Sequence, residues 1–175
     1  MDIMVDLETL STRNNAHILS IGACTVFDQS NTFYVTIAPG QNRHIDEHTV
    51  YWWMQQSDEA RDIFNHINSG NSTDLPLALV ALGEWMSEVA DDNPIHVWSH
   101  GATFDCVILA DAYDQYNIKL PWRYYNSRDT RTILDISERL GAYEKPERTG
   151  VHHNALDDAL YQSEWLATAL AQLRT

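Results

Sequence analysis

Apolar residues form three short segments near the start of the chain, in the alternating or continuous runs that are typical of β-strands. The segments cover 3–9, 18–27 and 32–37, and turn-forming residues at 28–31 separate the last two. Strands joined by such short polar turns usually pair antiparallel. The pattern therefore predicts a three-stranded antiparallel meander, which ends at Pro39-Gly40.

The apolar pattern changes to a helical period after residue 46. Helices are expected at about 46–54, 57–67, 76–90, 103–112, 130–140 and 154–173. Two further strands are expected between them, at 95–98 and 123–126. Three strands followed by alternating helices and strands predict an α/β fold, with one mixed five-stranded sheet flanked by helices. We expect residues 1–175 to form a single domain.

The charge balance is unusual for a protein that binds nucleic acid. The chain has 25 acidic and 11 basic residues, and its formal net charge is −14. This excludes binding through a broad basic surface, because that attraction scales with the number of phosphates neutralised. An acidic protein can still act on phosphodiesters where bound metal ions carry the positive charge. Affinity would be modest, and a basic protein partner is one way to prolong engagement.

No segment approaches the roughly 20 apolar residues of a membrane span. The N-terminus leads directly into a strand, without the basic region or cleavage site of a signal peptide. Cys24 and Cys106 lie in apolar runs and lack the spacing of a metal knuckle or a disulfide framework. We expect a cytoplasmic protein with two buried free thiols and no membrane partner.

Asp6 and Glu8 stand two residues apart on the first strand, so their side chains project from the same face. Adjacent carboxylates repel each other unless one is protonated or a cation neutralises both. Oxygen ligands suit hard divalent ions, which makes Mg²⁺ or Mn²⁺ the natural candidate. The alternative is structural, with Asp6 ending the strand and Glu8 capping the next segment.

Asp105 opens the helix that comes after the strand at 95–98. An acid in the first turn has a structural role, because a helix N-terminus favours negative charge. The position also lies at the carboxyl end of a strand, where open α/β sheets place their ligands. The residues alone leave both interpretations open.

A histidine and an aspartate lie at the start of the last helix. His153 just before the helix and Asp158 on its first turns can face the same cleft, an arrangement that suits a base beside a metal. His152, Asp157 and His100 are alternatives that spacing does not exclude.

Three motifs in this order resemble those of the DEDDh 3′→5′ exonucleases, the DnaQ-like branch of the ribonuclease-H-like superfamily. They are D-L-E-T from residue 6, G-A-T-F-D from residue 101 and H-N-A-L-D-D-A from residue 153. Segment 49–61 is similar to one in phage and prophage exonucleases and in a related group of bacterial exoribonucleases. The sequence departs from the pattern at Ser99, where the middle motif often has Asn, so no substrate contact is carried over there.

The resemblance implies a ribonuclease-H-like fold and a two-metal phosphodiester hydrolase. Carried over to these positions, it makes His153 the general base and assigns two Mg²⁺ or Mn²⁺ ions to the ligands Asp6, Glu8, Asp105 and Asp158. Asp6 would bridge the ions, and the five-residue interval after His153 favours Asp158 over Asp157. An inactive copy that only binds a nucleic-acid end or a protein is the non-enzymatic alternative.

The expected substrate is the 3′ end of a single strand, from which nucleoside 5′-monophosphates are released. Thr9 and Leu10 would meet the terminal 3′-OH and the last base, and Trp53 is either a base-stacking surface or a core residue. We expect DNA to be preferred, from the resemblance to phage exonucleases, with RNA as the alternative. A homodimer stays open.

Overall fold

The structure is a computed structural model that describes residues 1–141 and 145–173. The strands are β1 (Asp2–Thr9), β2 (Ile18–Thr25), β3 (Thr32–Thr36), β4 (His96–Ser99) and β5 (Ser127–Asp129). The helices are α1 (Glu47–Trp53), α2 (Asp58–Asn68), α3 (Leu75–Ala90), α4 (Asp105–Gln115), α5 (Thr130–Arg139) and α6 (Ala155–Gln172), with a short 3₁₀ turn, η1, at Tyr124–Asn126.

The five strands form one mixed sheet in the order β3-β2-β1-β4-β5. β1, β2 and β3 pair antiparallel, and β4 and β5 extend the sheet in parallel with β1. This confirms the predicted α/β class and the meander followed by parallel strands.

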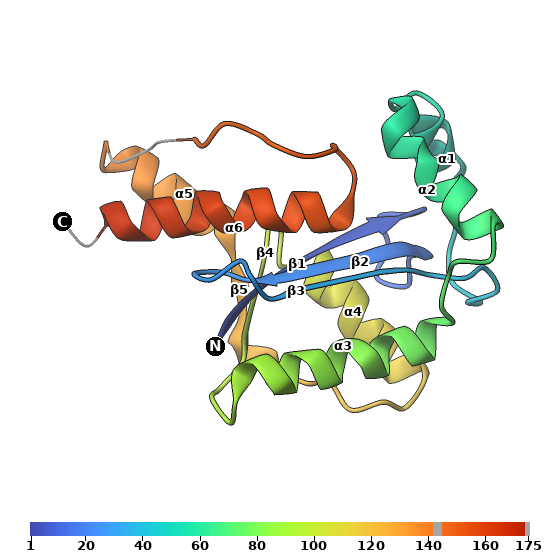
Figure 1. Cartoon of the computed structure of the whole chain (residues 1–175), viewed down its shortest axis with the longest axis horizontal. Helices are drawn as coiled ribbons and strands as arrows, with labels where there is room; N and C mark the ends of the chain where they lie inside the picture. The colour runs from blue at the N-terminus through green and yellow to red at the C-terminus, as the bar shows by residue number, and fades with distance from the viewer. Residues whose placement is uncertain (142–144, 174–175) are drawn as a thin grey trace.

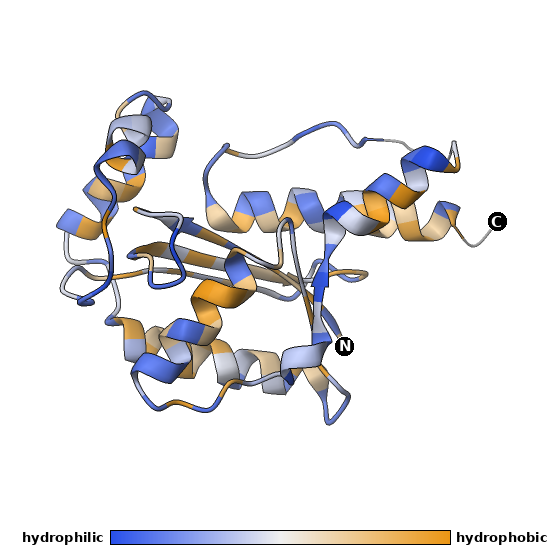
Figure 2. Cartoon of the chain, turned by 180° about the vertical axis from the view of Figure 1, so that it is seen from behind, coloured by the Kyte–Doolittle hydropathy of each residue, from blue (hydrophilic) through white to orange (hydrophobic). Residues whose placement is uncertain are grey.

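Helices cover both faces of the sheet (Figure 1). One face carries α3 and α4, which pack on Ile3, Val5 and Leu7 of β1. The other carries α6, which packs on Met4 of the same strand. Apolar residues gather where helices meet the sheet, and the connecting loops are largely hydrophilic (Figure 2). Because side chains alternate along β1, Asp6 and Glu8 share the face of Met4 and lie on the α6 side.

The helices α1 and α2 form a hairpin beyond the end of β1 (Figure 1). They enclose a small core of their own with Leu19 of β2, in which Trp53, Ala60 and Ile63 are buried. The Trp53 indole Nε1 donates to the Thr9 carbonyl oxygen at 2.9 Å. This bond fixes the hairpin to the residue immediately after Glu8.

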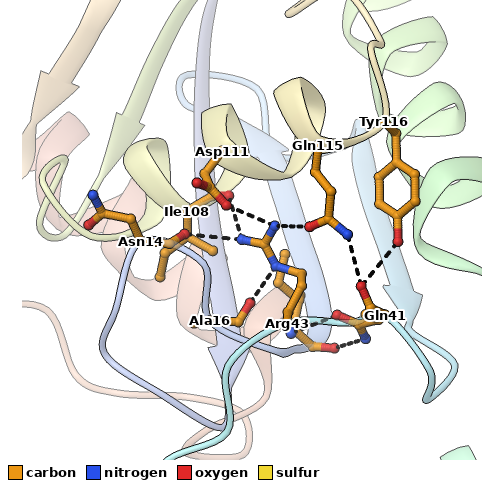
Figure 3. A network of polar contacts seen from close by, with 9 residues as sticks. Asn14, Ala16, Gln41, Arg43, Ile108, Asp111, Gln115 and Tyr116 are labelled. Atoms are coloured by element: carbon orange, nitrogen blue, oxygen red, sulfur yellow. Dashed lines mark hydrogen bonds and ion pairs between the residues drawn. The ribbon is translucent and has the colours of Figure 1, made fainter.

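A buried arginine, Arg43, joins the loop between β1 and β2 to α4 (Figure 3). The Arg43 guanidinium donates to the carbonyl oxygens of Asn14 at 3.0 Å, Ala16 at 2.7 Å and Ile108 at 3.3 Å. It also pairs with Asp111 at 2.9 Å. Since Arg43 has five donors in a fixed plane, one side chain satisfies several buried carbonyl groups.

The fifth strand begins after the segment predicted for it, so that prediction is wrong. Residues 124–126 form η1, and β5 is the polar segment Ser127–Asp129. Tyr124 and Tyr125 suggested a strand by their β propensity, but they are 84% and 52% exposed and cover no core. The Asn126 side chain instead turns inward and donates to the Ile95 carbonyl oxygen at 3.0 Å.

The remaining elements keep the predicted order with small shifts at their ends. Cys24 and Cys106 are buried free thiols, as expected. Within residues 1–141 and 145–173, no helix has both the length and the apolar character needed to cross a membrane.

Candidate active site

Asp6 and Glu8 lie on the last part of β1, where the strand has lost one neighbour. β4 pairs with β1 only through Asp2–Met4, so the backbone beyond Met4 needs another partner on that side. The Asp105 carboxylate supplies it by accepting from the Leu7 amide at 3.2 Å. This bond brings the first turn of α4 beside Asp6 and Glu8, although 98 residues separate Leu7 from Asp105.

The start of α6 brings the third segment to the same place. The Asn154 side chain caps the helix by accepting from the amides of Leu156 and Asp157 at 3.1 and 3.2 Å. Before the cap, His153 has a left-handed backbone, with φ of 64°. Its amide donates to Asp158 Oδ2 at 3.1 Å, so histidine and carboxylate are held on the same side of the helix start.

The segments meet closely enough for a shared ion. One ligand atom each from Glu8, His153 and Asp158 lies within 4.8 Å of the other two. Asp6 shares the β1 face of Glu8, and the Asp105 carboxylate accepts from the amide of Leu7, which lies between them in the chain. The structure thus brings together the five residues that the resemblance singled out, and their metal-binding and catalytic roles remain predictions.

The alternative residues lie elsewhere or are otherwise engaged. The Asp157 carboxylate accepts from the Val151 amide at 2.7 Å. The His152 side chain is exposed. The His100 ring stacks on Trp165 with a centroid distance of 5.7 Å, and its Nδ1 lies 2.9 Å from the Thr130 hydroxyl. None of the three belongs to the group around Glu8.

The carboxyl groups resist ionising together in this site. Burial is the main reason that the pKa of Asp6 is raised well above its ordinary value. Burial also raises the pKa of Glu8 to about 8, with the charge of Asp105 contributing. The pKa of Asp105 is raised to about 7, again by burial. Such groups are stabilised in their ionised form by a bound cation.

The His153 imidazole lies beside the carboxylates and under aromatic rings. Its centroid is 4.8 Å from the Trp52 ring and 6.1 Å from the Trp53 ring. Burial lowers the pKa of His153, and the charges of His152 and Arg148 lower it further. This lowered pKa favours the neutral ring, which is the form that can accept a proton.

The three predicted substrate residues differ in what they expose. Thr9 is buried, and its hydroxyl donates to the Ser11 carbonyl oxygen at 2.8 Å. Leu10 is partly exposed and packs against the α1–α2 core. Trp53 is only 2% exposed and belongs to the hairpin core, whereas its neighbour Trp52 is 42% exposed. The core interpretation therefore holds for Trp53, and Trp52 is the accessible ring of the pair.

Three further residues act on the site, and the sequence analysis did not identify them. Gln162 Nε2 donates to Asp6 Oδ1 at 2.8 Å, and its four-residue spacing from Asp158 could have revealed it. Arg148 forms an ion pair with Asp158, for which the loop sequence gave no signal. Ser99 is fully buried, so it offers nothing to a substrate, but its hydroxyl lowers the pKa of Asp105.

Solved structures similar to this chain are nucleases. The nuclease domain of 3′hExo, a DEDDh family member bound to rAMP, is 14% identical with a TM-score of 0.62, covering 98% of this chain and 91% of that one. A full-length 3′-exonuclease is 12% identical with a TM-score of 0.54, covering 99% of this chain and 60% of that one. At these identities the likeness establishes the fold. No curated protein sequence matches this chain.

A family model described as the 3′-5′ exoribonuclease Rv2179c-like domain matches residues 1–170. The match spans all three acidic motifs and nearly the whole chain. This chain therefore belongs to the Rv2179c-like 3′-5′ exoribonuclease family and is a DEDDh-type, DnaQ-like 3′-5′ exonuclease with a ribonuclease-H-like fold.

Proposed function

We propose that this exonuclease removes nucleoside 5′-monophosphates from the 3′ end of a single strand, with Asp6, Glu8, Asp105 and Asp158 as metal ligands and His153 as the base. The observation that carries the proposal is the convergence of β1, α4 and the start of α6 on neighbouring carboxylates with a histidine beside them.

The residues suit divalent ions of the hard type. The side chains offer carboxylate oxygens, and burial raises the pKa values of Asp6, Glu8 and Asp105, so a bound cation would stabilise their ionised forms. Two Mg²⁺ or Mn²⁺ ions would supply that charge to the attacking and leaving oxygens. Gln162 holds Asp6 in a fixed orientation between its neighbours.

His153 would take a proton from the attacking water. Its backbone amide donates a hydrogen bond to Asp158, and a ring nitrogen lies within 4.8 Å of a Glu8 carboxylate oxygen. The lowered pKa of His153 favours the unprotonated ring, which is the form that accepts a proton. The Trp52 and Trp53 rings restrict its rotation from the other side.

Selection for a 3′ end rests on the residues after Glu8. Leu10, which follows Glu8 by two residues and is partly exposed, would press against the last base. The Thr9 hydroxyl donates to the Ser11 carbonyl oxygen and keeps lone pairs that would accept from a terminal 3′-OH. The Trp52 ring is exposed enough to stack on a base. A duplex end would first have to unpair, at a cost of a few kcal/mol per base, so single strands should be cut faster.

The sugar is where two arguments differ. Resemblance to phage exonucleases favours DNA, whereas the matching family is described as exoribonuclease and favours RNA. RNA is the second candidate substrate. Because the family match covers residues 1–170, the experiment compares RNA and DNA on equal terms. Discrimination would depend on contact with the 2′-hydroxyl.

End-labelled single-stranded DNA and RNA of one sequence, digested side by side, test the proposal. With Mg²⁺ or Mn²⁺, mononucleotides should appear from the 3′ end, and EDTA should stop their release. A circular single strand should resist digestion. Internal fragments from the circle would contradict end recognition, and the faster of the two linear strands identifies the sugar.

Matched substitutions test the residues. Asp158→Asn should abolish cleavage, and His153→Ala should lower kcat by roughly 10²–10⁴ while metal binding persists. His152→Ala, which removes the exposed neighbour, serves as the control and should retain activity. If His152→Ala loses activity and His153→Ala keeps it, the assignment of the base is wrong.

A further inference from the structure

The loop before α6 places one arginine inside the acidic site. The Arg148 guanidinium pairs with Asp158, and the two side chains are only 21% and 12% exposed. Its charge also lowers the pKa of both Asp6 and Glu8. Among the described residues, Arg148 is thus the cation that offsets three of the site's four carboxylates.

The guanidinium is only partly satisfied in this position. Its Cζ atom lies 4.9 Å from the centroid of the Tyr161 ring, which covers one face. The buried Nε–H has no hydrogen-bond acceptor among the described residues. A buried donor without an acceptor is costly, so Arg148 retains capacity for another oxygen ligand.

The chain beside Arg148 is anchored on α6. Gly150 has φ of 79°, and a Cβ there would lie 2.7 Å from Asp157 Cγ, so the backbone touches this side chain. The hydrogen bond from the Val151 backbone amide to the Asp157 carboxylate adds a second attachment. The arginine side chain can therefore change partners while its backbone stays at the site.

Charge counting indicates what the new partner is. Two divalent ions neutralise four carboxylates, and the scissile phosphodiester then adds one negative charge with no counter-charge. A cation bound at Asp158 also competes with the guanidinium for the same oxygens. Arginine binds phosphate oxygens through paired N–H donors. A guanidinium that a metal ion displaces from Asp158 is therefore suited to bind the substrate phosphate.

Building on the proposed function, we propose that Arg148 is the counter-ion of the metal-free site, that metal binding at Asp158 displaces its guanidinium, and that the displaced guanidinium binds the substrate phosphate. Arg148 is then a substrate-positioning residue that also lowers the affinity for metal until substrate arrives.

Calorimetric titration with Mn²⁺ alone tests the displacement. Arg148→Gln should bind Mn²⁺ more tightly than the wild type, by roughly threefold to tenfold, because no ion pair has to be broken. Arg139→Gln is the matched control: Arg139 is 75% exposed and pairs with Asp135 at 2.9 Å in α5. It should leave Mn²⁺ affinity unchanged. Equal or weaker affinity in folded Arg148→Gln would overturn the counter-ion role.

Steady-state kinetics at saturating metal tests the phosphate contact. Arg148→Gln should raise KM for a single-stranded oligonucleotide by about tenfold, as for the loss of one charged contact, and Arg148→Lys should recover part of it. Thermal unfolding checks that both variants fold. If Arg148→Gln fails to fold, Arg148→Lys, which keeps the positive charge, is the variant used for the test. An unchanged KM in Arg148→Lys and Arg148→Gln refutes the contact. An inactive wild type would instead refute the proposed function, and the Mn²⁺ titration would still decide the displacement.

Discussion

His153 has a backbone conformation that few residues other than glycine adopt, with φ of 64°. The conformation is held by the hydrogen bond from the His153 backbone amide to the Asp158 carboxylate and by the adjacent Asn154 cap. A strained residue of this kind persists only where its surroundings hold it, and such residues cluster at functional sites. At the scale of single residues, the site is thus preorganised around the helix start.

The carboxylates make the stability of the metal-free protein depend on pH. Folding raises the pKa of Glu8 from 4.5 to about 8, so the folded state binds more protons than the unfolded chain across that window. The stability contributed by protonated Glu8 is complete below its unfolded pKa of 4.5. It is lost as the pH rises through its folded pKa of about 8. We expect the Tm in EDTA to fall between about pH 5 and pH 8, with a free-energy change on the order of a few kcal/mol.

Two variants separate this effect from the general acidity of the chain. Glu8→Gln should make the fall in Tm in EDTA shallower, with the remainder due to Asp6 and Asp105, whereas Glu88→Gln, which removes an exposed acid from α3, should leave the fall unchanged. Saturating Mg²⁺ should also remove most of the fall in the wild type. A Tm that rises steadily from pH 5 to pH 8 without metal would contradict the raised pKa of Glu8.

Among the elements, α6 depends on a close approach to β2. A Cβ on Gly22 would lie 2.2 Å from the backbone carbon and oxygen of Ala155, so only glycine lets the helix start reach the sheet. Gly22 is also the β2 partner of Asp6. The contact therefore sets the separation between the carboxylates of β1 and those of α6.

We expect Gly22→Ala to displace the start of α6 and to impair catalysis more than stability. Overpacking of this kind typically costs about 1–3 kcal/mol, while a shift of about 1 Å in catalytic groups can lower the rate about 100-fold. The measurements are Tm and kcat at saturating Mg²⁺.

Gly83→Ala is the matched control for this substitution. It lies in α3, and its nearest neighbour would be 3.8 Å away. It should be tolerated, and the better helix propensity of alanine should offset any loss. Full activity in Gly22→Ala would show that α6 can shift without disturbing the site.

At the scale of the whole molecule, the net charge of −14 opposes a polyanionic substrate. Binding then depends on a few local contacts, so few counter-ions are released when the strand binds. We expect kcat/KM on a single strand to fall by less than about threefold between roughly 50 and 200 mM KCl, at constant free Mg²⁺. A protein with 6–10 phosphate contacts would lose about 10³–10⁵ in affinity over that range.

Loss of a hundredfold or more over the same salt range would contradict this expectation and would indicate an extended basic surface. A rise in kcat/KM would agree with it, because salt screens the repulsion between two negatively charged molecules.

The sequence by itself determined the fold class and the elements that hold the site. Period-two runs and short polar turns predicted the meander, and ordered motifs around Asp6, Asp105 and His153 indicated the nuclease family. These features are local in the chain, so pattern and propensity suffice to identify them. The prediction failed at β5, where Ser127–Asp129 pairs in parallel with β4 and has no apolar residue to mark it as a strand.

Only the tertiary structure decided which side chains share the site and which support it. The bonds from Leu7 to Asp105 and from Gln162 to Asp6 join residues that are 98 and 156 positions apart. The burial of Trp53, the pairing of Arg148 with Asp158 and the need for glycine at position 22 also depend on packing between distant elements. Such contacts leave no periodic trace in the chain, because they arise from the way helices and sheet meet rather than from the order of neighbouring residues.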